Sequence, residues 1–168
     1  DGAGRNAAVI VELKQWQSAE SVPGKDGIVR TFINGGDHEV THPSYQAWSY
    51  ATAIADFNAD IQARGVVLRP CACLHNYIER CPEPLLDPIY DFYTRNAPVF
   101  AKHDGLRLKS FFESVLKKGD GLETIFLMDR GRLRPSKSLQ DVLASMMDGN
   151  REFVMIDTQK VVFEGIMD

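Results

Sequence analysis

The chain has 168 residues, of which 44% are hydrophobic and 25% are charged, and it carries a formal net charge of −4 at pH 7. This composition is ordinary for a soluble globular α/β protein, and the length allows one sizeable core, or one core with a small appendage. The net charge excludes a globally basic surface, so any contact with nucleic-acid phosphates must come from local basic patches.

No apolar run reaches the length of a membrane span, and no signal peptide precedes the first predicted strand. Three cysteines, an odd number, fit a reducing compartment better than a disulfide framework. We therefore expect a cytoplasmic protein without membrane contact. Because the sequence starts without Met and soon reaches a core-like strand, we also expect it to be a piece of a longer protein.

The first part of the chain predicts a turn, a strand and a loop region. Residues 1–8 are rich in Gly and Ala and predict the tip of a hairpin. Residues 9–14 follow as a strand, and their Val, Ile and Leu side chains are typical of a buried one. Turn signals with Gly interrupt residues 15–44, which predicts a loop, one short strand or hairpin, and a second loop.

The next segments predict a strand–helix–strand core. Pro43 disfavours helical backbone in the residue before it, so Ser44 is the predicted N-cap of a helix that runs to about Ala63. Gly65 ends this helix, and residues 66–74 read as a strand parallel to the first.

The remaining segments predict mostly short helices. Three prolines open a short aromatic helix, a brief extended piece follows, and an amphipathic helix comes next. Residues 122–128 fit a strand or a helical turn equally well. In chain order, the other predicted elements cover residues 82–96, 98–100, 106–118, 135–149 and a final helix from about 157.

The end of the first strand carries two charges on one face. Glu12 and Lys14 are two residues apart, so their side chains point the same way, about 7 Å apart along a strand. A glutamate at this place is a candidate Mg²⁺ ligand, and the lysine could orient a water or stabilise developing charge. An ion pair on an edge strand is the alternative.

A second pair of polar residues lies on the following helix. Gln46 and Tyr50 are four residues apart and therefore share a helix face. An amide and a phenol there could reach back to Lys14, to water on a metal, or to a nucleic-acid strand.

Glu-x-Lys at a strand end, followed by Gln-x-x-x-Tyr on a helix, resembles the RecB-like branch of the PD-(D/E)xK nuclease superfamily. The wider context is similar to the N-terminal part of bacterial Schlafen-like DNA/RNA helicases, in which a nuclease-like region precedes a P-loop ATPase. The resemblance spans nearly the whole chain and lies in the stretches 10–16, 42–51, 74–77, 134–137 and 157–162.

The resemblance implies a restriction-endonuclease-like core, a small mixed sheet flanked by helices, over residues 1–103. Residues 104–168 would form a helical extension leading to an ATPase domain outside this sequence. The implied function is Mg²⁺- or Mn²⁺-dependent endo- or exonuclease cleavage of DNA or RNA, with Glu12 as metal ligand and Lys14, Gln46 and Tyr50 completing the site. A non-catalytic nucleic-acid-binding or interdomain scaffold is the alternative.

The sequence departs from the family pattern at one position. The superfamily's first metal-binding Asp lies on the strand before Glu-x-Lys, and residues 1–8 read as the turn after that strand. Asp1 is a poor substitute, because a flexible first residue cannot preorganise a metal site. We therefore expect this fragment to lack that residue and to be inactive alone, with an unpaired sheet edge that permits a homodimer.

Near the C-terminus, Asp157-x-Gln159 is similar to the glutamine motif that superfamily-one helicases place before their phosphate loop, where the amide reads adenine. No G-x-x-x-x-G-K-[ST] follows, so we expect ATP binding only in the full-length parent. A solvated residue at a helix start is the alternative reading of Gln159.

Two further groups have alternative readings. Cys71, Cys73 and His75 alternate along a strand, with Cys81 nearby, which suggests zinc, although buried structural cysteines explain them as well. A basic cluster is a candidate phosphate-binding surface, although a solvated loop fits it too. It consists of Arg130, Arg132, Arg134 and Lys137.

Overall fold

The computed structural model describes residues 1–78, 83–133 and 161. These residues form two three-stranded sheets flanked by helices. The α/β class predicted from the sequence is confirmed. The expected mixed sheet is instead divided, because the parallel and the antiparallel strands form separate sheets.

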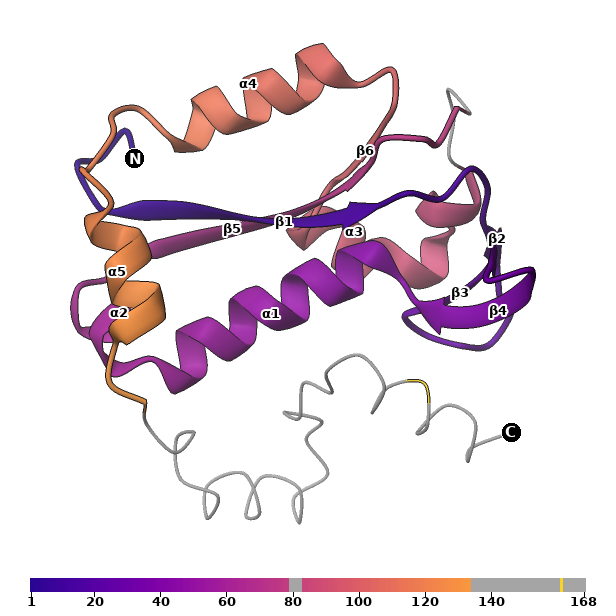
Figure 1. Ribbon diagram of the computed structural model, residues 1–168, viewed down its shortest axis with the longest axis horizontal. Helices are drawn as coiled ribbons and strands as arrows, with labels where there is room; N and C mark the ends of the chain where they lie inside the picture. Colours follow the sequence, from indigo (N-terminus) through magenta and orange to yellow (C-terminus); the bar gives the residue numbers. More distant parts are fainter. Residues whose placement is uncertain (79–82, 134–160, 162–168) are drawn as a thin grey trace.

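The first sheet is parallel and holds the two strands predicted most clearly from the sequence. Its order is β1 (Ala7–Lys14), β5 (Val67–Leu74) and β6 (Val99–Ala101). Helix α1 (Pro43–Phe57) connects the first two and packs on one face, while α4 (Gly105–Val115) covers the other (Figure 1). Strand–helix–strand is therefore the core, as predicted.

Strand β1 is an edge strand, one of the two alternatives that the sequence leaves open, although its apolar run is typical of a buried strand. In the part of the chain that the structure describes, β1 pairs only with β5. Val11 and Leu13 point away from α1 and are 37% and 65% exposed. The apolar run predicted a strand correctly, but the number of neighbours on each side depends on the fold.

The second sheet is an antiparallel meander of β2 (Glu20–Ser21), β3 (Ile28–Ile33) and β4 (Gly36–Thr41). Asn34 and Gly35 form the turn between β3 and β4 with φ of 52° and 83°, and this two-residue, left-handed conformation matches the twist of a hairpin. The sequence predicts one short strand or a hairpin in this region, and the structure has the hairpin, with the additional strand β2 where a loop is predicted.

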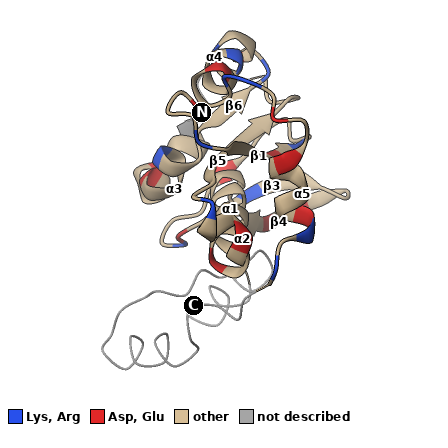
Figure 2. Ribbon diagram, turned by 90° about the vertical axis from the view of Figure 1, so that its left-hand side faces the viewer, with Lys and Arg blue, Asp and Glu red and all other residues tan. Residues whose placement is uncertain are grey.

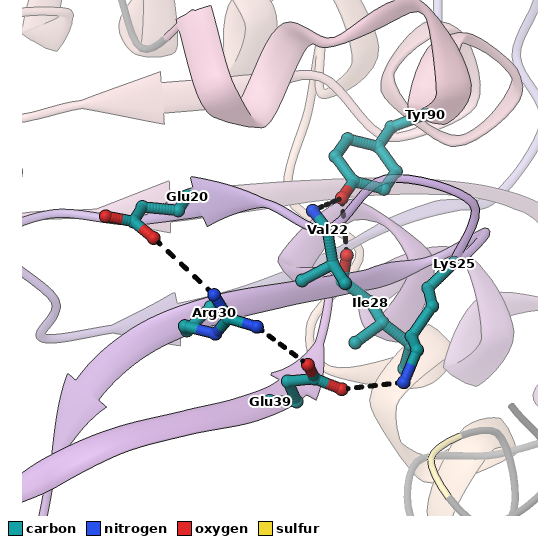
Figure 3. A network of polar contacts seen from close by, with 7 residues as sticks. All are labelled: Glu20, Val22, Lys25, Ile28, Arg30, Glu39 and Tyr90. Carbon is teal, nitrogen blue, oxygen red and sulfur yellow. Dashed lines mark hydrogen bonds and ion pairs between the residues drawn. The ribbon is translucent and has the colours of Figure 1, made fainter. Parts of the chain in front are cut away.

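Tyr90 joins this meander to the helices that follow β5. Its ring is fully buried, and its hydroxyl accepts from the Val22 backbone N–H at 3.1 Å and donates to the Ile28 carbonyl (Figure 3). Glu39 on β4 binds Arg30 on β3 at 3.0 Å and Lys25, in the loop before β3, at 3.1 Å. The contacts of Tyr90 anchor the meander beside the carboxyl end of β1.

The long helix predicted over 44–63 is two helices. Asn58 has an extended backbone (φ −100°, ψ 105°), and its side chain caps α2 (Ala59–Ala63) by accepting from the backbone N–H groups of Asp60 and Ile61. The same side chain donates to the Leu127 carbonyl in α5 (Glu123–Arg130) at 2.8 Å. The break therefore comes from capping and a tertiary contact, which helix periodicity does not show.

The other helical elements follow the prediction with small differences. The proline-rich segment contains η1 (Glu83–Leu86), η2 (Pro88–Tyr90) and α3 (Asp91–Asn96). The amphipathic α4 ends at Val115, before the predicted 118, and the segment 122–128 is helical. The helices predicted over 135–149 and from 157 lie outside the described residues.

Candidate functional site

Glu12 and Lys14 meet at the carboxyl end of β1, as the strand period predicts. Lys14 Nζ lies 2.8 Å from Glu12 Oε1, and the two side chains are only 20% and 15% exposed. Lys14 pairs in register with Leu74, the last residue of β5, so the ion pair lies where two parallel strands end. Ligands of open α/β sheets bind at such carboxyl edges.

Helix α1 supplies the next two polar groups. Lys14 Nζ donates to Gln46 Oε1 at 2.7 Å, and Gln46 Nε2 donates to the Tyr50 hydroxyl at 2.8 Å. The structure thus brings all four predicted catalytic residues into one chain of contacts. A helix starting directly after β4 and packing on β1 places Gln46 over the lysine.

This chain of hydrogen bonds has a single direction. An ammonium has no lone pair, so the amide oxygen of Gln46 must face Lys14 and its nitrogen must face Tyr50. The phenol oxygen of Tyr50 therefore accepts from Gln46, and its own O–H proton is directed away from Gln46. Tyr50 can then donate to an oxygen of a bound molecule.

His42 fixes where α1 begins, in place of the predicted Ser44. Its Nδ1 accepts from the Ser44 backbone N–H at 3.1 Å, so its Nε2 carries the proton and donates to the Leu85 carbonyl at 3.0 Å. Complete burial lowers the pKa of His42 to about 4. The neutral ring stacks on Tyr90 with centroids 4.5 Å apart, which holds the start of the helix against the core.

One residue of this cluster was missed in the sequence. Trp16 is 8% exposed, and Lys14 Nζ lies over its ring, 5.3 Å from the centroid. The sequence contains a sign of this contact. Trp16 follows Lys14 by two residues, as Lys14 follows Glu12, so a strand period of two predicts that all three side chains share a face. The aromatic core that buries Trp16 contains residues far apart in the chain, among them Tyr45, Tyr77 and Tyr93.

The cluster contains one carboxylate that could serve as a metal ligand. Mg²⁺ is often held by one or two carboxylates together with water and substrate phosphates, so the Glu12 carboxylate fits the smaller of these ligand sets. Within residues 1–78, 83–133 and 161, no group of three or more His, Cys, Asp or Glu side chains could hold a metal ion. Asp1 does not contribute to this site, since its carboxylate binds Arg5 at 2.8 Å at the opposite end of β1.

The cysteines of β5 fit a structural role. Cys71 is fully buried, and burial raises the pKa of its thiol to about 11. Burial raises the pKa of Cys73 as well, so both thiols stay protonated near neutral pH. His75 is exposed beyond the strand end, and Cys81 lies outside the described residues.

The predicted basic cluster is only partly described, and its described members have acidic partners. Arg132 binds Asp60 through Nη2 at 2.9 Å and Nε at 3.2 Å, and this contact holds the pKa of the Asp60 carboxyl below its usual range. Arg130 lies 3.8 Å from Asp129 and stacks over Phe126. Around α5, basic and acidic residues lie next to one another (Figure 2). Arg134, Lys137 and Gln159 lie outside the described residues.

The chain matches no protein-family model, no curated protein and no solved structure. Among the described residues, no helix is long and apolar enough to cross a membrane.

Proposed function

We propose that Glu12, Lys14, Gln46 and Tyr50 form the phosphodiester site of a nuclease-like domain of the PD-(D/E)xK type that acts on DNA or RNA. The observation that carries the proposal is the continuous contact from the Glu12 carboxylate through Lys14 and Gln46 to Tyr50. A cation, an amide and a phenol held in fixed order can bind a phosphodiester and stabilise its negative charge, and the carboxylate beside them is a candidate metal ligand.

Each residue has a task that follows from its contacts. Lys14 is held in place by two acceptors, and its ammonium stabilises the negative charge that develops on the phosphate once Glu12 turns to the metal ion. Gln46 sets the direction of the chain, and the Tyr50 hydroxyl donates to a phosphate oxygen. Glu12 would hold Mg²⁺ or Mn²⁺, which when bound would supply Lewis-acid activation of the phosphodiester and of the attacking water.

The small number of candidate metal ligands favours a second function. The cluster offers a single carboxylate, and that carboxylate already faces an ammonium at 2.8 Å. These features fit a domain that keeps the nuclease fold and binds nucleic acid without cutting it, as an interdomain scaffold beside an ATPase domain of the same parent protein.

A cleavage assay separates the two functions. The full-length protein that carries this chain is incubated with single- and double-stranded DNA and RNA in Mg²⁺ or Mn²⁺. The test variants are Glu12→Gln and Lys14→Ala, and the matched control is Lys109→Ala. Lys109 is an exposed lysine on α4, 3.7 Å from Glu113.

The nuclease function predicts metal-dependent cleavage that falls by roughly 10²-fold or more in both test variants and is unchanged in the control. Cleavage that persists in the Glu12 and Lys14 variants would contradict the assignment of the site. If wild-type protein does not cut but binds with a steep salt dependence, the scaffold function replaces the nuclease function.

Tyr50→Phe tests whether the Tyr50 hydroxyl donates to the substrate. Loss of the hydroxyl removes one donor to the substrate and one acceptor for Gln46, so affinity for nucleic acid should fall about 2- to 10-fold. The change is measured by titration of labelled oligonucleotide. Unchanged affinity would show that Tyr50 does not contact the substrate.

A further inference from the structure

Three groups surround the ammonium of Lys14. Glu12 Oε1 and Gln46 Oε1 lie at 2.8 and 2.7 Å, and the Trp16 ring lies on a third side with its centroid at 5.3 Å. An ammonium has three N–H groups. Two can donate to the oxygens of Glu12 and Gln46, and the third can face the Trp16 ring. Lysine otherwise carries its charge on a flexible four-carbon stem.

The contact between Lys14 and Trp16 differs from the other cation–π contacts of the described residues. Arg107 over Phe100 and Arg130 over Phe126 involve side chains that are 66% and 78% exposed. The Lys14 side chain is only 20% exposed. Because water weakens the attraction between a cation and a ring, the contact at Trp16 is the strongest of the three.

Glu12 has two incompatible tasks in the proposed function. Its carboxylate pairs with Lys14 in this structure, yet it would turn to a metal ion when the site is loaded. At that moment Lys14 loses one of its two acceptors. Gln46 alone is a single neutral partner, and a lysine held by one such bond is free to swing toward solvent.

We propose that Trp16 is a positioning residue whose indole face holds the Lys14 ammonium in the site when Glu12 turns to a metal ion. The inference rests on the proposed function for its role in cleavage, but the geometric part does not depend on it. Trp16 is suited to the task because its burial in the aromatic core fixes the ring. A fixed ring preorganises the lysine before substrate arrives.

The first test is spectroscopic and needs no activity. An aromatic ring shifts the NMR signals of protons above its face upfield, so the ε-methylene protons of Lys14 should resonate upfield of those of the exposed Lys109. In Glu12→Gln, which removes the carboxylate charge at similar shape, this upfield shift should persist. When Glu12→Gln is combined with Trp16→Phe, the upfield shift should persist in part. When Glu12→Gln is combined with Trp16→Leu, the upfield shift should vanish.

The result that overturns the proposal is an ε-methylene signal of Lys14 that moves to the Lys109 position in Glu12→Gln alone. Such a shift would mean that Glu12, and not the ring, holds the lysine. The Glu12→Gln variant leaves the core intact, so this outcome can be read even where Trp16→Leu does not fold.

The second test is kinetic. Trp16→Leu should lower kcat about 2- to 30-fold at unchanged KM, and Trp16→Phe should restore most of the rate, because phenylalanine keeps a π face. Equal kcat in the Leu and Phe variants would refute a role of the ring in cleavage. If wild-type protein does not cut while the NMR shift follows the expected pattern, the nuclease function fails and the positioning of Lys14 by Trp16 stands.

Discussion

Protonation of His42 should make the fold sensitive to acid. In the unfolded chain this histidine titrates near 6.5, whereas complete burial lowers its pKa to about 4 in the fold. When the pH falls below 6.5, the unfolded state takes up a proton that the folded state refuses, so unfolding becomes more favourable. The contribution is complete near pH 4, where the folded state is protonated too.

The size of the effect follows from the gap between the two pKa values. At about 1.4 kcal/mol per pH unit, lowering the pH from 7 to 4 should reduce the free energy of unfolding by about 3 kcal/mol through this one group. Such a loss is a large share of the stability of a small domain.

The assay is urea unfolding of wild-type protein and His42→Asn near pH 7, 5.5 and 4. Asparagine can still accept from the Ser44 backbone N–H, but it does not titrate and cannot stack on Tyr90. We expect the variant to be less stable near pH 7 and its deficit to shrink by about 3 kcal/mol on going to pH 4. A deficit that does not change with pH would refute the reasoning.

Three further perturbations test the fold. Gly131→Ala should destabilise the chain by about 1–3 kcal/mol in thermal unfolding, since the added Cβ would lie 2.3 Å from Asn58 Oδ1, whereas Gly119→Ala meets nothing within 4 Å and should have no such effect. Tyr90→Phe should cost about 1–3 kcal/mol in urea unfolding, because the buried hydroxyl serves two backbone groups, and an unchanged midpoint would contradict those contacts. If the open edge of β1 pairs with a second copy, sedimentation should show concentration-dependent dimers that Leu13→Lys abolishes, and a monomer at every concentration would exclude this mode.

The four residues of the candidate site illustrate what local periodicity can predict. The strand period of two places Glu12 and Lys14 on one face, and the helix spacing of four does the same for Gln46 and Tyr50. Neither period predicts that this face of β1 contacts this face of α1. That contact requires α1 to pack on the face of β1 that carries the charges, which depends on the whole strand–helix–strand unit.

The basic cluster is a case in which the local sequence did not predict the contacts of its residues. Arg130 and Arg132 are two residues apart in the sequence, but the fold brings Asp60 to Arg132 from a helix 72 residues earlier. An ion pair between such distant residues leaves no trace in a local pattern. A run of basic residues therefore indicates a phosphate-binding surface only once the tertiary partners of these residues are known.

The parallel pairing of β1 with β5 follows from the helix between them, by the general rule for strand–helix–strand units. The sequence alone was also sufficient for the α/β class, for the strands β1 and β5 themselves and for the shared faces of the polar pairs. These features depend on neighbouring residues, whose backbone preferences and side-chain periods act locally. The tertiary structure decided that β1 is an edge strand and not a buried one, that α1 breaks at Asn58, and that Gln46 contacts Lys14. These features depend on contacts between residues far apart in the chain, and only the packed fold brings such residues together.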